Sequence, residues 1–273
     1  MQRVSFHTSF LLPILILAIG FTTQSAPAQN FDLEGYDPVD KTSVFKQANE
    51  FYRQEEYQKA LKGYLYLHNL GIKNGYLSYN LGNTYFSLGE LGKAILWYER
   101  AKRYLPRFED LQVNYEYARQ NLADDEFRAP EYTGTIGLLL DLHNMLNLRE
   151  TFFILCFFFW LFILATIIML WTGRENIRSR LRIPCWLLLF AVILFSLSLG
   201  LKIYRYEYKQ EAIVMQSAVD VKTGPGSDLS VLFTIHEGTK VILAQEQDNW
   251  RRIYMPGNRA FTGWLPKSAI EKI

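Results

Sequence analysis

The stretch that decides the fold is TFFILCFFFWLFILATIIMLW, residues 151–171, which contains no charged residue. A helix of this length crosses roughly 30 Å of hydrocarbon. Its Leu, Ile and Phe residues each favour insertion at the bilayer centre by about 0.3–0.6 kcal/mol. We therefore expect residues 151–171 to form a transmembrane helix.

A second apolar stretch follows, with Trp186 and Tyr204 near its ends, where aromatic side chains anchor a helix among lipid headgroups. It predicts a second transmembrane helix over residues 184–204. The intervening residues 172–183, TGRENIRSRLRI, hold four arginines and one glutamate, and short basic loops of this kind stay in the cytoplasm. The sequence therefore predicts a membrane hairpin whose two flanking domains lie on the opposite, extracytoplasmic side.

The N-terminus carries the features of a secretory signal peptide over residues 1–28. Arg3 is followed by an apolar run. Ala26 and Ala28 are small residues at the spacing of a signal-peptidase site, which predicts cleavage before Gln29. The alternative is an uncleaved anchor, for which the apolar run is short. In both cases the chain that follows is exported.

Composition excludes several classes of function. The 29 Lys and Arg residues nearly balance the 27 Asp and Glu residues, so the net charge gives no basis for nucleic-acid binding. Cys156 and Cys185 lie inside apolar stretches, which excludes a disulfide scaffold and a cysteine zinc site. No catalytic set or metal-ligand cluster stands out, so we expect no cofactor and no enzymatic activity. The acidic pairs Glu55-Glu56 and Asp124-Asp125 are expected to be solvated charges.

Residues 41–125 contain an internal repeat with a period of 34 residues. The period relates Ala48 to Gly82, Phe51 to Tyr85, Ala60 to Ala94, Tyr64 to Tyr98 and Leu67 to Ala101. A period of this size is typical of an array of helical hairpins. The second copy carries Leu81, Gly82, Tyr85, Gly89, Ala94, Tyr98, Ala101 and Pro106 at the spacing of the tetratricopeptide repeat, which it resembles.

The resemblance implies two helical hairpins and a capping helix over roughly 108–123. Arrays of fewer than about three repeats are marginally stable alone. We therefore expect this domain to lean on a partner, on a second copy, or on the segment near the membrane.

The resemblance also implies a peptide-binding groove on the first helix of each hairpin. It assigns to this groove Thr42, Phe45, Asn49, Tyr52, Tyr76, Tyr79, Asn83 and Phe86. Asparagine amides can hold an extended peptide backbone, and aromatic rings supply contact area at low entropic cost. The alternative is that these aromatic residues pack between neighbouring helices. Positions that are basic in carboxylate-clamping relatives are Phe45, Val113 and Tyr117 here, so the expected ligand is an extended or helical segment with apolar anchors.

Residues 134–148, GTIGLLLDLHNMLNL, precede the first span and are expected to form an interfacial helix on the membrane. His143 within it could suggest a pH sensor, but it is more simply a polar residue on the face of such a helix.

The C-terminal residues 211–273 change to short alternating segments separated by Gly- and Pro-containing turns, which predicts a small β-barrel. Their order and spacing resemble the bacterial SH3-like domain. Because members of that family often bind cell-wall peptides, the resemblance implies a ligand surface made of Gly224, Pro225, Gly226, Ser227, Trp250 and Trp264. The alternative places the tryptophans in the barrel core; it is favoured for Trp264 and open for Trp250.

The order of signal peptide, tetratricopeptide pair, membrane hairpin and SH3-like barrel resembles the BatE family of the Bacteroides aerotolerance operon. The resemblance implies an inner-membrane protein with periplasmic domains, which acts with other Bat proteins, some carrying von Willebrand A-type domains, in oxidative-stress tolerance. The sequence thus favours a non-enzymatic interaction scaffold. The alternative is a module that binds peptidoglycan or senses the cell envelope through the SH3-like domain.

Overall fold

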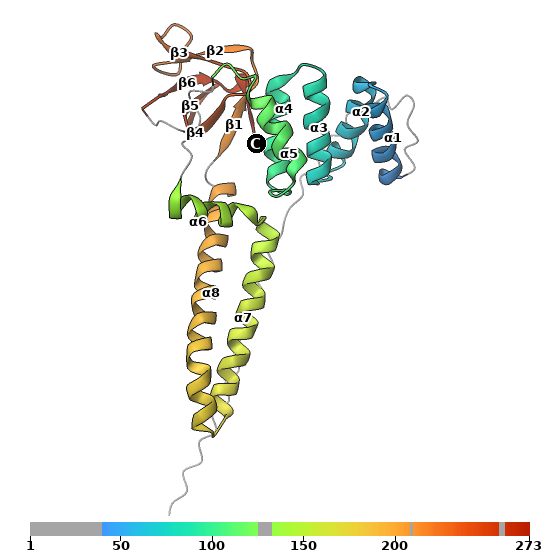
Figure 1. The fold of residues 1–273 in the computed structure, drawn as a ribbon. Coiled ribbons are helices and arrows are strands. Elements are labelled where there is room, and N and C mark those ends of the chain that lie inside the picture. The colour runs from blue at the N-terminus through green and yellow to red at the C-terminus, as the bar shows by residue number, and fades with distance from the viewer. Residues whose placement is uncertain (1–39, 125–132, 208–209, 257–259) are drawn as a thin grey trace, which may run out of the picture. The chain divides into compact units, whose positions relative to one another are not determined.

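The structure, a computed structural model, describes residues 40–124, 133–207, 210–256 and 260–273. The predicted signal peptide, residues 1–28, lies outside the described residues. In the part of the chain described, eight α-helices precede an antiparallel sheet of seven strands (Figure 1). The expected division into an α-helical N-terminal part, two long apolar helices and a C-terminal all-β part is therefore present.

The first five helices repeat at an interval of 34 residues. They are α1 (Lys41–Arg53), α2 (Tyr57–Asn69), α3 (Gly75–Ser87), α4 (Leu91–Lys102) and α5 (Glu109–Arg119). The first residues of α3, α4 and α5 lie 34 positions after those of α1, α2 and α3. The period read from the sequence is therefore the period of the helices, and α5 occupies the place of a first helix in a third hairpin.

The turn inside each hairpin follows the same period. Gly89, between α3 and α4, has a φ of 77°, and its counterpart Glu55, between α1 and α2, has a φ of 61°. In both turns this residue donates its backbone N–H to a carbonyl three residues earlier, that of Phe86 or Tyr52. The first copy thus keeps the left-handed turn although it lacks the glycine that adopts this conformation without strain.

Gly82 permits the close approach of α3 and α4. A Cβ atom on this glycine would lie 2.5 Å from Cδ1 of Tyr98, which is fully buried. Its counterpart in the first hairpin is Ala48, also fully buried. Small residues at these two positions let the large tyrosine of the second helix fill the space between the paired helices.

Two helices are long and apolar enough to cross a membrane, namely α7 (Leu148–Trp171) and α8 (Glu175–Glu207). They pack against each other, and α6 (Gly134–Met145) precedes them. The start of α7 is fixed by a capping box in which Asn147 accepts from the Glu150 N–H and Glu150 accepts from the Asn147 N–H.

The predicted loop over residues 172–183 is much shorter than expected, because α8 begins at Glu175 and continues through Pro184. The segment is rich in good helix formers, and Glu175 places a negative charge in the first turn, where the helix dipole favours it. Arg178 Nε donates to the Met169 carbonyl at the end of α7, at 3.1 Å. Three of the four arginines, Arg178, Arg180 and Arg182, therefore sit on the first turns of a helix, and Arg174 directly precedes it.

The strands are β1 (Glu211–Val214), β2 (Ala218–Lys222), β3 (Val231–His236), β4 (Lys240–Gln247), β5 (Trp250–Tyr254), β6 (Thr262–Pro266) and β7 (Ile270–Lys272). Their order in the sheet is β3-β2-β6-β5-β4-β1-β7. Alternate residues face a core that includes the fully buried Val221, Ile235, Ile253, Met255 and Leu265. The alternation expected from the sequence is present along β2, β5 and β6, whereas β1 and residues 241–243 of β4 are buried throughout.

The helical array packs against the sheet. Ile213 of β1 is fully buried within the core of the helices, and Met215 and Ile273 pack against the same core. Arg100 of α4 donates to the Glu271 carboxylate at 2.9 Å and to the Lys272 carbonyl at 2.7 Å. The sheet was not among the supports expected from the sequence for this short array, and it covers part of α4.

Candidate functional site

Two hydrogen-bonded groups of polar side chains repeat within the array. In the first, Asn49 Oδ1 accepts from Tyr64 Oη at 2.7 Å and from Asn80 Nδ2 at 2.9 Å. The second is displaced by 34 residues: Asn83 Oδ1 accepts from Tyr98 Oη at 2.8 Å and from Asn114 Nδ2 at 3.0 Å. Each asparagine therefore joins its own hairpin to the next helix.

The carbonyl oxygen and the amide nitrogen of each predicted groove asparagine take part in different contacts. The carbonyl oxygen of Asn49 and of Asn83 is used twice inside the protein. Among residues 40–124 no bond from Asn49 Nδ2 is found, whereas the Asn83 side chain also bonds to the Tyr79 hydroxyl. Both asparagine side chains are only partly buried. Because an amide nitrogen carries two N–H groups, each asparagine keeps at least one donor that a bound chain can use.

The aromatic residues predicted for the groove form a band across α1, α3 and α5. Tyr52 Oη lies 3.4 Å from Ser87 Oγ, which links α1 to α3. The Phe86 ring packs edge-on to the Tyr117 ring at 5.6 Å, which links α3 to α5. The alternative of packing between neighbouring helices therefore holds for Tyr52 and Phe86, and both side chains are only partly buried.

The most exposed members of this band are Tyr76 (50%), Val113 (66%) and Tyr117 (60%). Phe45, Tyr52, Tyr79 and Phe86 are partly buried. Tyr79 accepts from Asn114 Nδ2 at 3.0 Å, and burial raises the pKa of its hydroxyl. We call these seven residues together with Asn49 and Asn83 the aromatic face; it is apolar at its rings and carries amide donors between them.

The residues predicted for the ligand surface of the sheet also come together. Lys222 Nζ lies 5.9 Å from the centre of the Trp250 ring and donates to the Ser227 carbonyl of the glycine-rich turn. Lys222 pairs in register with Trp264 on β6. One lysine therefore connects the turn with both tryptophan positions.

The glycine-rich turn itself is closely packed. Gly224 is buried, and a Cβ atom there would lie 2.8 Å from Cδ1 of Leu229. Pro225 and Gly226 are partly buried, and Ser227 is exposed. Gly224 thus shapes the turn, while the outer atoms of the next three residues remain accessible.

The sequence favours a position in the barrel core for Trp264, and the structure does not place it there. It is partly buried and lies outside the sheet's core cluster, between the buried Gly263 and Leu265 on the same strand. Because side chains alternate along a strand, Trp264 faces away from that core. It shares this outer surface with Arg252, its register partner on β5.

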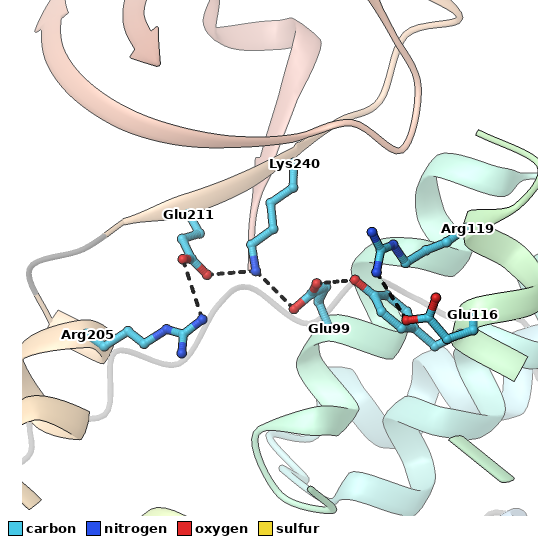
Figure 2. Close-up of polar contacts among 7 residues, drawn as sticks. Glu99, Glu116, Arg119, Arg205, Glu211 and Lys240 are labelled. Atoms are coloured by element: carbon cyan, nitrogen blue, oxygen red, sulfur yellow. Dashed lines mark hydrogen bonds and ion pairs between the residues drawn. The ribbon is translucent and has the colours of Figure 1, made fainter. Parts of the chain in front are cut away.

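A chain of charged side chains, which sequence reasoning did not identify, joins the sheet to α4 and α8. Figure 2 shows Lys240 between two carboxylates, at 2.9 Å from Glu211 and 3.2 Å from Glu99. Glu211 also lies 3.8 Å from Arg205 at the end of α8. Glu99 accepts a hydrogen bond from Tyr115 of α5 at 2.5 Å. We call these five residues the charged junction.

The pKa values follow from burial and mutual contact. Burial raises the pKa of Glu99, but the ammonium groups of Lys240 and Lys102 and the bond from Tyr115 lower it by more, so Glu99 stays ionised. Burial lowers the pKa of Lys240, but Glu99 and Glu211 raise it by more. Glu99 and Lys240 are therefore both charged in the neutral pH range.

Asp124 forms a second link and corrects the expectation that it is a solvated charge. Its carboxylate accepts from the His236 backbone N–H at 2.6 Å and from Thr239 Oγ1 at 2.7 Å, and it contacts His236 Nδ1 at 2.9 Å. Burial raises the pKa of Asp124, but the hydrogen bonds from Thr239 and His236 lower it by more. Its sequence neighbour Asp125 lies outside the described residues.

Over the residues that the structure describes, no group of three or more His, Cys, Asp and Glu side chains could hold a metal ion. No protein-family model, no curated protein and no solved structure matches the chain. The function is therefore inferred from the geometry of the protein's own surfaces.

Proposed function

We propose that the chain is a membrane-anchored, non-enzymatic scaffold whose helical hairpins, built like tetratricopeptide repeats, bind a segment of a partner protein on the aromatic face. The observation that carries the proposal is the exposure of Tyr76, Val113 and Tyr117 on one side of the array. A monomeric protein gains nothing from leaving large apolar side chains in water at adjacent positions, whereas a binding surface uses them as anchors.

The chemistry of this face suits an extended or helical segment with apolar anchors. Val113 and Tyr117 provide no positive charge for a terminal carboxylate, while the amide nitrogens of Asn49 and Asn83 can donate to backbone carbonyls. The resemblance to the BatE family suggests other Bat proteins, including those with von Willebrand A-type domains, as the source of the segment. It also suggests an inner-membrane location, with the helical array and the SH3-like sheet in the periplasm.

Site-specific photo-crosslinking in native membranes tests this proposal. A photoreactive residue replaces Tyr117, and a matched control replaces Lys62, an exposed residue on α2. We expect a discrete protein adduct from position 117 that is lost when Tyr76→Ser and Val113→Ser are added, and no such adduct from position 62. Equal adducts from both positions, or an adduct at 117 that survives both substitutions, would contradict the proposal.

Topology is tested separately with reporters. A reporter fused after Ile273 should behave as extracytoplasmic and one inserted at Ser179 as cytoplasmic, because the four arginines of residues 172–183 favour retention inside. The reverse pattern would place the aromatic face in the other compartment.

The second candidate function is recognition of peptidoglycan by the sheet. It is favoured by the contact of Lys222 with Trp250 and Ser227 and by the outward position of Trp264. Co-sedimentation of the detergent-solubilised full chain with purified sacculi separates the two candidates. Retention that is lost with Trp250→Ser would support peptidoglycan binding, whereas the scaffold proposal requires no retention.

A further inference from the structure

A cavity of about 270 Å³ lies where the helical array, the sheet and the membrane helices meet. Its walls come from α4 and the residues after it, from the end of α6, from the last turns of α8, and from β1 and β4. The polar and charged lining residues are Glu99, Lys102, Arg103, His143, Asn144, Lys202, Arg205, Tyr206, Glu211 and Lys240.

Positive charge exceeds negative charge among these side chains. Five are Lys or Arg, and two are glutamates. Both glutamates already belong to the charged junction, where they contact Lys240 and Arg205. Among the described residues, no carboxylate lies within 4.0 Å of the other three cations, Lys102, Arg103 and Lys202.

Each of these three cations contacts a neutral group. Lys202 is only 7% exposed, and its Nζ donates to the His143 carbonyl at 2.5 Å. The Arg103 guanidinium lies 5.2 Å from the centre of the Tyr206 ring. The Lys102 Nζ lies 4.2 Å from the centre of the Tyr115 ring. None of these contacts neutralises a charge. Burial lowers the pKa of Lys102, and Lys240 and Arg119 lower it further, against the opposite effect of Glu99 and Glu116.

The cavity also lies at one end of both apolar helices. Asn144 lies in the last turn of α6, and Leu146 lies between α6 and α7. Lys202 and Arg205 belong to the last turns of α8. The adjoining helix α6 exposes Ile136, Leu138, Leu139, Leu142 and Met145. An apolar helix at the end of two membrane-spanning helices is suited to the depth of lipid headgroups.

We propose that this cavity is a binding site for a phosphate-bearing anion, held by Lys102, Arg103 and Lys202. Arginine pairs with phosphate oxygens through two N–H groups, and lysine contributes a point charge. An anionic phospholipid headgroup and free phosphate share this chemistry. The site is independent of partner binding on the aromatic face.

The test uses the full chain in an uncharged detergent, titrated with dioctanoyl phosphatidylglycerol, dioctanoyl phosphatidylcholine or inorganic phosphate and observed by native mass spectrometry. We expect saturable binding of the phosphatidylglycerol that weakens by about tenfold in Arg103→Gln, as loss of one charge-assisted contact implies. Arg103→Lys should recover part of the affinity. The matched control is Lys62→Gln, which removes an exposed charge from α2 and should leave binding unchanged.

The titrations with phosphatidylglycerol and with inorganic phosphate distinguish the two sources of the anion. Binding of phosphatidylglycerol without inorganic phosphate identifies a lipid headgroup, and equal binding of inorganic phosphate identifies the free ion as sufficient. The proposal is overturned if neither binds saturably, if the zwitterionic phosphatidylcholine binds as tightly as the anionic lipid, or if Arg103→Gln and Lys102→Gln both bind like the wild type. Lys102→Gln serves as the second variant because it removes a different cation of the same site.

Discussion

Replacing Lys240 by methionine should loosen the packing of the sheet on α4. Methionine keeps the length of the side chain but leaves Glu99 and Glu211 facing each other without the cation that lies 3.2 and 2.9 Å from them. The side chains of both glutamates are about one-tenth exposed, so water cannot replace the lost partner. Removing one member of a buried ion pair typically costs about 3–5 kcal/mol.

Hydrogen exchange of the full chain measures this loss locally. A cost of about 3–5 kcal/mol corresponds to roughly two to four orders of magnitude faster exchange for amides protected by this packing, in α4 and β1. The matched control Lys62→Met removes an exposed cation from α2 and should change the free energy of opening by less than about 0.5 kcal/mol.

The pH dependence gives a second, sign-specific readout. In the wild type the pKa of Glu99 is below its unfolded value, so its contribution is complete at neutral pH and is lost only as the pH falls below about 4. Without Lys240, only Lys102 and the bond from Tyr115 still oppose burial, so the pKa of Glu99 rises. A carboxyl with a raised pKa destabilises the fold less once it is protonated, so the destabilisation caused by Lys240→Met should shrink as the pH falls from neutral, over a range where the wild type changes little.

The double variant Glu99→Gln, Lys240→Met decides whether the reasoning holds. It removes one buried charge that the single variant leaves unpaired, so it should be more stable than Lys240→Met alone. If Lys240→Met exchanges like the wild type, or if adding Glu99→Gln makes it less stable, then the junction does not stabilise the packing of the sheet on α4.

Gly82→Ala should cost about 1–3 kcal/mol in thermal unfolding, because its Cβ would lie 2.5 Å from Cδ1 of Tyr98; a wild-type melting temperature would contradict the close packing. Tyr98→Phe and Tyr64→Phe should each cost about 1 kcal/mol through the lost hydroxyl bond, and unequal costs would show that the two repeats are not energetically equivalent. Asp124→Asn should speed amide exchange at His236 near neutral pH, whereas below about pH 4 the wild type should approach the variant, because the depressed pKa of this carboxyl means that its contribution is lost on acidification.

Features that repeat along the chain could be predicted from the sequence because their cause is local. The 34-residue period relates small residues at 48 and 82 and tyrosines at 64 and 98, all four of which are buried, and Gly82 lies against Tyr98 in the structure. The two apolar helices follow from uninterrupted runs of apolar residues, and the sheet follows from alternation. In each case the pattern of one segment is enough to indicate which kind of element it forms.

The charged junction could not be predicted in this way. Glu99 and Lys240 are 141 residues apart, and neither has an unusual neighbour in the sequence. In the sequence, Asp124 looks like an ordinary charged residue after the end of a helix. Its hydrogen bond with the His236 N–H appears only in the folded chain. The start of α8 was missed for another reason: a basic segment before Pro184 is typical of a loop, but helix propensity and the contact of Arg178 with α7 extend the helix through it.

The contacts of the helical array with the sheet and those that can bind a partner lie largely on different helices. The contacts of the array with the sheet come largely from α4: Gly92 N–H to Glu237 at 3.1 Å, Glu99 to Lys240, and Arg100 to Glu271. The aromatic face is made by α1, α3 and α5. Because a short array is marginal alone, the sheet supplies the cover that further hairpins give in longer arrays. A segment bound to the aromatic face therefore has no need to displace the sheet, and the array can be folded before any partner arrives.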